Sequence, residues 1–162
     1  MIFRPRHFLF RSASAFTLAE VTIVIFIIAL LAAVAIPRYA LAEARYRVAM
    51  AEQRILADLA LAQAVAKTSS AGQSVSFNVA SNNYQMTGYA GPLGGTVQST
   101  YTVSLAADPY QATLVSASFN STTQLTYTRF GQPSSGGTVV VQVGAYQKTI
   151  TVDPNTGKAS GS

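Results

Sequence analysis

An uninterrupted apolar run near the amino terminus constrains this chain more than any other feature. Phe16 to Ile36 gives 21 residues with a single charged side chain, Glu20. A helix of that length rises about 31 Å at 1.5 Å per residue, which is close to the thickness of the hydrocarbon core of a bilayer. The run therefore predicts a helix that crosses a membrane.

The segment before this run distinguishes a membrane anchor from a secretory signal. Residues 1–15 carry three arginines and His7, and the small-x-small motif at 13–15 (Ala-Ser-Ala) precedes the apolar run. A secretory signal has its apolar core before the cleavage site. A cut after Ala15 therefore removes a short basic leader and leaves the apolar helix as the new amino terminus. The alternative is an uncleaved signal anchor with a chance Ala-Ser-Ala.

These residues resemble the amino-terminal motif of the type IV pilin and pseudopilin superfamily. The match is Ala15-Phe16-Thr17-Leu18-Ala19-Glu20, followed by the aliphatic run and Pro37. The resemblance implies that prepilin peptidase cuts the bond between Ala15 and Phe16 and that Phe16 is then N-methylated. Gly is usual before the cut in that family, and Ala15 stands there in this chain. The family's glutamate at the fifth mature position corresponds to Glu20.

Glu20 is costly in a membrane helix and so needs a partner. A carboxylate at mid-bilayer costs about 2.5 to 3.5 kcal/mol on insertion scales, and less near a helix end. After cleavage, Glu20 lies one turn from the free amine of Phe16, where the helix dipole favours negative charge. The two groups pair either within one chain or, as the resemblance implies, between neighbouring subunits, which sets the register of filament assembly.

Composition limits the chemistry that the rest of the chain can perform. The chain of 162 residues has 11 Lys+Arg and 6 Asp+Glu, and three of the arginines lie in the leader, which leaves eight basic side chains. A net charge of about +2 after cleavage is a weak indication of nucleic-acid binding. The chain has no Cys, and its one His, His7, lies in the leader. We therefore expect no catalytic, metal or cofactor site, and predict that the protein is not an enzyme.

A helical pattern continues beyond Pro37 to about Lys67. Apolar residues recur at steps of three and four: Leu41, Ala44, Val48, Ala51, Ile55, Leu59, Ala62 and Ala66. The opposite face carries the charged residues Arg38, Glu43, Arg45, Arg47, Glu52, Arg54 and Asp58. We predict that residues 37–67 form an amphipathic continuation of the membrane helix at 16–36. Pro37 removes a backbone hydrogen bond, which predicts a kink.

The composition changes after Gly72 to Val, Thr, Ser, Tyr and Gln, which is typical of β-structure. Alternation predicts strands at 75–79, from Tyr84, and at 97–105, 112–119, 124–130, 138–144 and 146–152. A loop at 88–95 interrupts them, and a turn at 153–157 ends the sheet. The prediction is an α+β, pilin-like fold: one long helix packed on an antiparallel β-rich domain at 73–159.

The closing residues narrow the resemblance. Phe130-Gly131, a Gly/Ser loop, Val139 to Val143, a hairpin, Thr149 to Val152 and Thr156-Gly157-Lys158 are similar to the H-type minor pseudopilins of type II secretion and to FimT-like minor pilins. The resemblance implies other pilin or pseudopilin subunits, prepilin peptidase and the inner-membrane assembly platform as partners. The basic leader predicts a single-pass protein of the bacterial inner membrane with a cytoplasmic amino terminus.

Three functions follow from these patterns. The leading one is a structural minor subunit of a type II secretion pseudopilus or type IV pilus-like filament. The second is a DNA-binding minor pilin in DNA uptake. Six tyrosines of the β-rich domain could stack on bases, and the cations beside them are Arg129, Lys148 and Lys158. Half-buried positions in the sheet explain these tyrosines better. The third is a signal-anchored surface domain outside any filament.

Asp108 and Asp153 each precede a Pro, which indicates turns.

Overall fold

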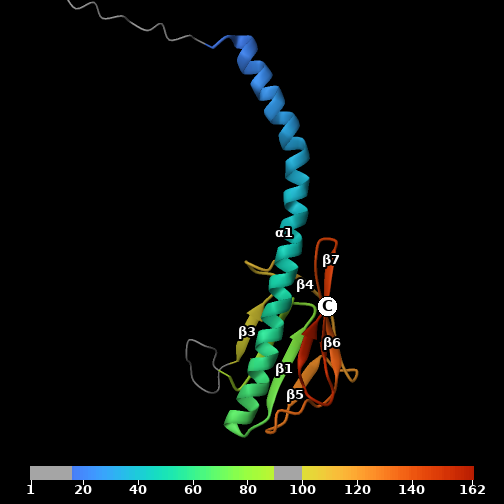
Figure 1. Cartoon of the computed structure of the whole chain (residues 1–162). Helices are drawn as coiled ribbons and strands as arrows, with labels where there is room; N and C mark the ends of the chain where they lie inside the picture. Colours follow the sequence, from blue (N-terminus) through green and yellow to red (C-terminus); the bar gives the residue numbers. More distant parts are fainter. Residues whose placement is uncertain (1–15, 90–99) are drawn as a thin grey trace, which may run out of the picture. The chain divides into compact units, whose positions relative to one another are not determined.

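The computed structural model describes residues 16–89 and 100–162 as one long helix and eight strands (Figure 1). The helix is α1 (Leu18–Ser69), and the strands are β1 (Gln73–Asn78), β2 (Asn83–Thr87), β3 (Tyr101–Ser104), β4 (Thr113–Phe119), β5 (Gln124–Tyr127), β6 (Gly137–Val143), β7 (Tyr146–Val152) and β8 (Ala159–Gly161). The predicted α+β class is confirmed. The leader and most of the predicted loop at 88–95 lie outside the described residues.

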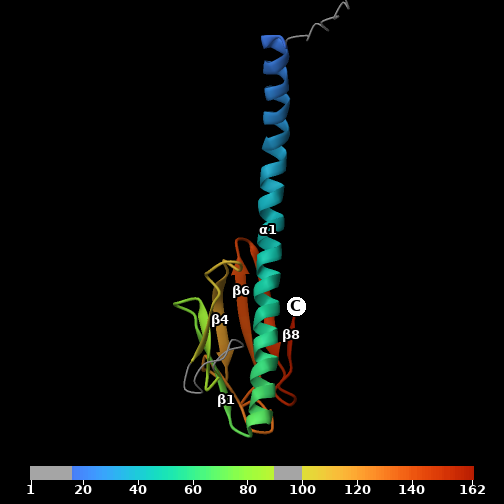
Figure 2. The ribbon, with the colours of Figure 1, turned by 90° about the vertical axis from the view of Figure 1, so that its left-hand side faces the viewer.

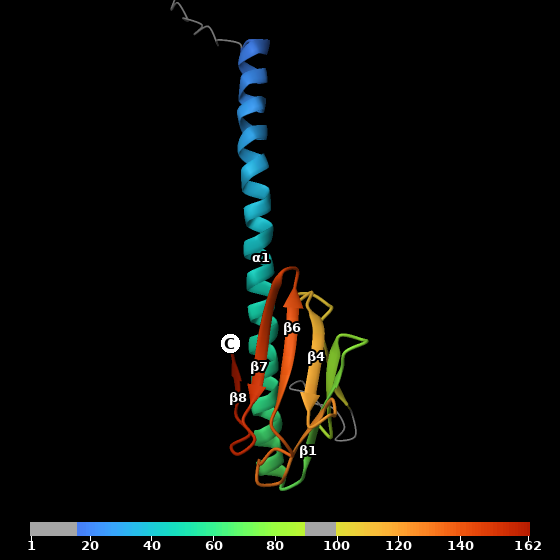
Figure 3. The same cartoon turned by 90° about the vertical axis from the view of Figure 1, so that its right-hand side faces the viewer.

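The chain divides into two compact units, which meet in the sequence between Tyr39 and Ala40. All the strands belong to the second unit, where they form two antiparallel sheets with the orders β3-β2-β1-β5 and β4-β6-β7-β8. Phe77 of β1 and Phe119 of β4 stack with ring centroids 5.7 Å apart, which joins the two sheets. The part of α1 within this unit lies along the sheets (Figures 2 and 3).

The apolar stripe of the helix packs on the sheets only from Val48 onward. Val48, Ile55 and Leu59 are buried in one cluster with inward-facing strand residues, as the spacing of three and four predicts. Leu41 belongs to the same stripe, yet 51% of it is exposed. The stripe that the spacing predicts is therefore longer than the part of it that packs on the strands.

Asp58 lies in the core, although its spacing predicts the exposed face of the helix. The side chain is 6% exposed, and its Oδ2 accepts hydrogen bonds from the Tyr84 hydroxyl at 2.5 Å and from Arg54 Nε at 3.0 Å. Arg54 also donates to the hydroxyl of Tyr101 on β3. Burial, and then the negative charge of Asp58, raises the pKa of Tyr84. This polar cluster ties the helix to β2 and β3.

Glu52 is a second correction to the predicted charged face. It is 8% exposed, and its Oε2 lies 3.4 Å from Lys148 Nζ on β7. The glycine at position 161 leaves room for it, because a Cβ there would clash with Glu52 Oε1. Strand residues supply these partners, so spacing within the helix could not predict them.

The turn after β7 is confirmed, but the sheet does not end there. Asp153 Oδ1 accepts the backbone N–H groups of Asn155 at 2.7 Å and Thr156 at 3.0 Å, which lowers the pKa of that carboxyl. After the turn, β8 pairs with β7, Val152 opposite Ala159. The sequence Ala-Ser-Gly lacks the β-branched and aromatic residues that signal a strand, which explains the missed prediction.

Candidate functional site

The amino-terminal end of α1 has a defined cap. The helix begins at Leu18, and the preceding Thr17 has the two hydrogen bonds of an N-cap residue. Its Oγ1 accepts a hydrogen bond from the N–H of Glu20 at 3.2 Å, and its carbonyl accepts one from the N–H of Val21 at 3.2 Å. Glu20 therefore stands at the third helical position, within the first turn. The spacing Thr-x-x-Glu is the sequence signal of a capping box, and it could have predicted this cap.

Phe16 and Glu20 lie on the same side of the helix start. Together with Val21, Val24 and Ile25 they line one shallow hollow, and Phe16 is 78% exposed. The carboxylate thus lies one turn from the backbone of Phe16, at the positive end of the helix dipole. The arrangement suits pairing with a cationic amine on the same chain or on a neighbour. Ala15, the other half of the predicted cleavage site, lies outside the described residues.

The helix that follows is long and apolar enough to cross a membrane. Its apolar window has a mean hydropathy of 2.8, and none of that window is buried in the chain itself. Exposed Val, Ile, Leu and Phe side chains surround the helix on every side. Such a surface requires lipid or other helices around it. Pro37 lies within α1, and the kink predicted there stays a prediction.

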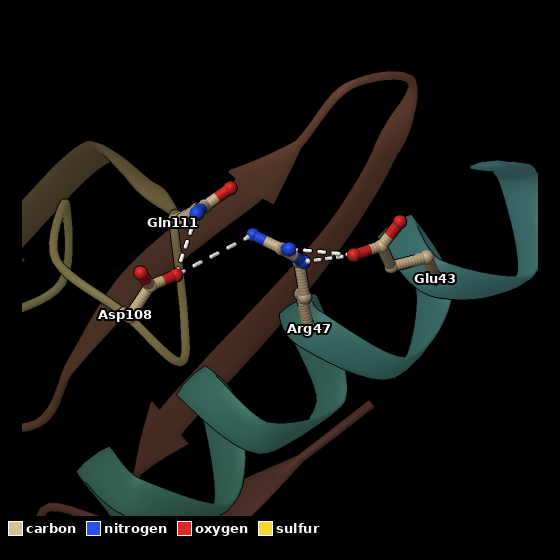
Figure 4. Close-up of polar contacts among 4 residues, drawn as sticks. All are labelled: Glu43, Arg47, Asp108 and Gln111. Carbon is tan, nitrogen blue, oxygen red and sulfur yellow. Dashed lines mark hydrogen bonds and ion pairs between the residues drawn. The ribbon is translucent and has the colours of Figure 1, made fainter.

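Four polar residues meet near the start of the second unit (Figure 4). Arg47 Nη2 lies 2.5 Å from Glu43 Oε1, and Arg47 Nη1 lies 4.0 Å from Asp108 Oδ1. The same oxygen of Asp108 accepts a hydrogen bond from Gln111 Nε2 at 2.6 Å. The guanidinium of Arg47 therefore lies between two carboxylates and forms an ion pair with each of them.

Two of the three basic groups predicted to favour nucleic acid have partners within the chain. Lys148 is paired with Glu52, and Arg129 lies over the ring of Phe130, 4.8 Å from its centroid. Of the six tyrosines in the β-rich domain, Tyr84 and Tyr127 are buried and the other four are half-buried. Burial raises the pKa of Tyr127 to about 12. The prediction of sheet positions is confirmed for four of them, Tyr84, Tyr101, Tyr127 and Tyr146, whereas Tyr89 and Tyr110 lie outside the strands.

No group of three acidic or histidine side chains that could hold a metal ion occurs within residues 16–89 and 100–162. Asp153, whose sequence resembles the opening of a calcium loop, instead uses its carboxylate to cap its own turn.

Comparison with known proteins identifies the family. The sequence model of the family described as type II transport protein GspH matches residues 51–157, which is most of the second unit. The chain belongs to the GspH family. No curated protein and no solved structure matches it.

Membership in the GspH family decides several of the expectations. The predicted resemblance to H-type pseudopilins is confirmed, and the family is a structural one, not a family of enzymes. As a GspH protein, the chain is a pseudopilin subunit of type II secretion, and other pseudopilin subunits are its partners. Within residues 16–89 and 100–162 there is one helix apolar and long enough to cross a membrane, near the amino terminus, which fits a single-pass protein of the inner membrane. The match does not include residues 16–50, so the amino-terminal motif is an independent observation.

Proposed function

We propose that this protein is a minor subunit of the type II secretion pseudopilus, cleaved between Ala15 and Phe16 by prepilin peptidase and N-methylated on Phe16. The observation that supports this most strongly is the start of α1. There Phe16 and Glu20 share one hollow in front of an apolar helix that the chain itself leaves uncovered. A filament of such subunits covers this surface helix against helix.

In the proposed assembly, Glu20 pairs with the Phe16 amine of a neighbouring subunit and sets the register between them. The carboxylate and the amine are each costly in lipid, and the pair removes both costs. The apolar helix moves from lipid into the core of the filament with little change in apolar exposure. The β-rich domain faces outward, because the basic leader keeps the amino terminus in the cytoplasm. The inner-membrane assembly platform completes the set of partners.

Mass spectrometry of membranes and of sheared filaments from the native cell tests the processing. We expect an amino terminus at N-methylated Phe16 in both fractions, with this chain at a trace molar share among a more abundant pseudopilin. A chain that dominates the filament would be a major subunit. Met1 retained in membranes, with none of the protein in filaments, would refute the proposal.

Glu20→Ala tests the assembly role in the same cells. The variant enters the membrane normally, and its share in filaments falls by at least tenfold, because about 1.4 kcal/mol of lost pairing energy changes an equilibrium tenfold. Thr22→Ala is the matched control, since the Thr22 hydroxyl donates to carbonyls of its own helix, at 2.7 Å to Leu18 and 3.0 Å to Ala19. Normal filament incorporation of Glu20→Ala would exclude this role.

A further inference from the structure

One turn of the second unit presents an aromatic side chain that the core does not use. After β5, the N–H of Gly131 donates to the carbonyl of Thr128 at 2.7 Å, and the N–H of Thr128 donates to the carbonyl of Gln132 at 2.8 Å. The two residues at the tip of this closed turn are Arg129 and Phe130, and 68% of Phe130 is exposed. Polar residues and glycine are the usual occupants of such tips, so packing within the chain does not explain this ring.

The turn is fixed on the last part of α1. Gln63 Nε2 donates to the carbonyl of Gly131 at 2.8 Å and to the carbonyl of Thr156 at 2.8 Å, which ties this turn to the turn after β7. Lys67 lies directly over Gly131, where a Cβ would clash with the lysine side chain. Both turns therefore lie beside the end of the helix (Figures 1 and 3). Because its support is already ordered, Phe130 can bind a partner at a low cost in entropy.

Three exposed cations belong to the same region. The guanidinium of Arg129 lies 4.8 Å from the ring centroid of Phe130, which orients the cation without neutralising it. Lys67 packs on the neighbouring glycine, and Lys158 ends the turn after β7. Within residues 16–89 and 100–162, none of the three lies within 4.0 Å of a carboxylate oxygen. The carboxylate on these turns is Asp153, so three positive charges against one negative leave a net charge of +2.

We call Lys67, Arg129, Phe130 and Lys158 the basic turn patch. The other carboxylates of residues 40–162 do not complement it. Glu52 and Asp58 are buried with their own partners, and Glu43 and Asp108 both pair with Arg47 (Figure 4). A second unit from another copy of this chain therefore offers no acidic surface to the patch, and a different protein is the better occupant.

We propose that the basic turn patch docks an acidic segment of a different protein, in which carboxylates flank an apolar side chain. The apolar side chain packs on Phe130, and the carboxylates pair with Arg129, Lys67 and Lys158. Aromatic and Arg side chains are frequent anchors of protein interfaces, and a guanidinium binds a carboxylate through two parallel hydrogen bonds. Nucleic acid fits less well, since three cations neutralise few phosphates and one ring stacks on one base. The inference goes beyond the proposed function, because it gives the chemistry of a partner and does not depend on the first unit.

Photo-crosslinking of the full chain in the native cell tests the occupant. The photoreactive residue benzoylphenylalanine replaces Gln132, an exposed residue of the turn whose hydrogen bonds with Thr128 use its backbone. In a matched control it replaces Val115, which is 41% exposed on β4. Mass spectrometry identifies the cross-linked peptides. We expect position 132 to cross-link to a segment of a different protein that has a net negative charge, and position 115 not to cross-link to that segment.

Substitutions in the patch test its two components. Phe130→Ala should lower the cross-link yield at position 132 about tenfold, as expected for an aromatic anchor. Lys67→Met, Arg129→Gln and Lys158→Gln together should also lower it about tenfold, because each exposed ion pair contributes about two- to threefold. Arg45→Gln, which removes an exposed cation elsewhere on the second unit, should leave the yield unchanged. Near-ultraviolet circular dichroism of the purified variants checks that the fold is kept.

Each other result overturns the proposal. A cross-link to a second copy of this chain, to nucleic acid or to a segment without net negative charge would assign the patch to another occupant. A yield that neither Phe130→Ala nor the triple substitution changes would mean that the partner binds elsewhere. A yield at position 132 no higher than at position 115 would mean that the patch has no occupant.

Discussion

At the scale of single residues, Asp58 carries the most connections in the core. It accepts hydrogen bonds from Tyr84 and Arg54, and Arg54 in turn donates to Tyr101. A buried carboxylate without partners is very costly, so the cluster must form as a unit. Three elements, α1, β2 and β3, are thereby fixed to one another.

Asp58→Ala should destabilise the second unit strongly. The change leaves the Tyr84 hydroxyl and the Arg54 guanidinium without their acceptor, which costs about 3 to 5 kcal/mol in the free energy of unfolding for a broken buried pair. Asp108→Ala is the matched control, because Asp108 is exposed and an exposed ion pair contributes about 0 to 1 kcal/mol. Urea unfolding of the full chain in detergent, followed by near-ultraviolet circular dichroism, measures both. Equal losses for the two variants would contradict the role of the cluster.

The residues at the helix start could be predicted from sequence, whereas those of the buried cluster could not. Phe16 and Glu20 are recognisable because the motif and the apolar run are contiguous in the chain. Asp58 is 26 residues from Tyr84, and only the pairing of β2 within its sheet brings the two together. Helical spacing assigned Asp58 to the polar face because it contains no information about distant strands.

At the scale of elements, the helix within the second unit is stabilised by packing along one stripe. Leu59 lies in the middle of that stripe and is fully buried, while Leu41 belongs to the same stripe in sequence but is half exposed. The helical pattern predicts the same face for both leucines, but only Leu59 is covered by the sheets.

Leu59→Ala and Leu41→Ala form a matched pair. The first should lower the free energy of unfolding by about 2 to 5 kcal/mol, because it removes buried apolar surface and leaves a cavity. The second should change it by less than about 0.5 kcal/mol, as expected for a surface position. Urea titrations of the two variants in the same detergent provide the comparison. A large loss for Leu41→Ala would mean that the packed stripe extends further along α1 than the structure indicates.

The strands show where sequence patterns succeed and where they fail. β6 and β7 were predicted to within a residue, because both alternate strictly and a tight turn joins them. The division into two sheets was not predicted, since alternation identifies strands without saying which strands pair. β8 was missed because its three small residues carry no β signal. Its antiparallel pairing with β7 is what makes this segment a strand.

At the scale of the whole molecule, the two units support the functional interpretation in different ways. The GspH match lies in the second unit, and the processing motif and the apolar run lie in the first. The motif resembles the wider type IV pilin and pseudopilin superfamily, and the match to the GspH family, which begins at residue 51, does not depend on it. The rival function, DNA binding, has to be judged on the charge of the whole chain.

We expect no specific or salt-sensitive DNA binding by the full chain in detergent. Eight basic side chains against six acidic ones remain after the leader is removed, and two of the three basic groups of the β-rich domain are engaged, Lys148 by Glu52 and Arg129 by Phe130. Affinity for nucleic acid grows with the number of phosphates neutralised, so a chain with few unpaired cations should bind DNA more weakly than about 10⁻⁴ M at physiological salt. A gel shift with single-stranded and duplex DNA at low and high salt measures this. A shift that disappears with rising salt and weakens in Lys158→Gln would instead favour a DNA-binding minor pilin, because only a real phosphate contact reduces the salt dependence when it is removed.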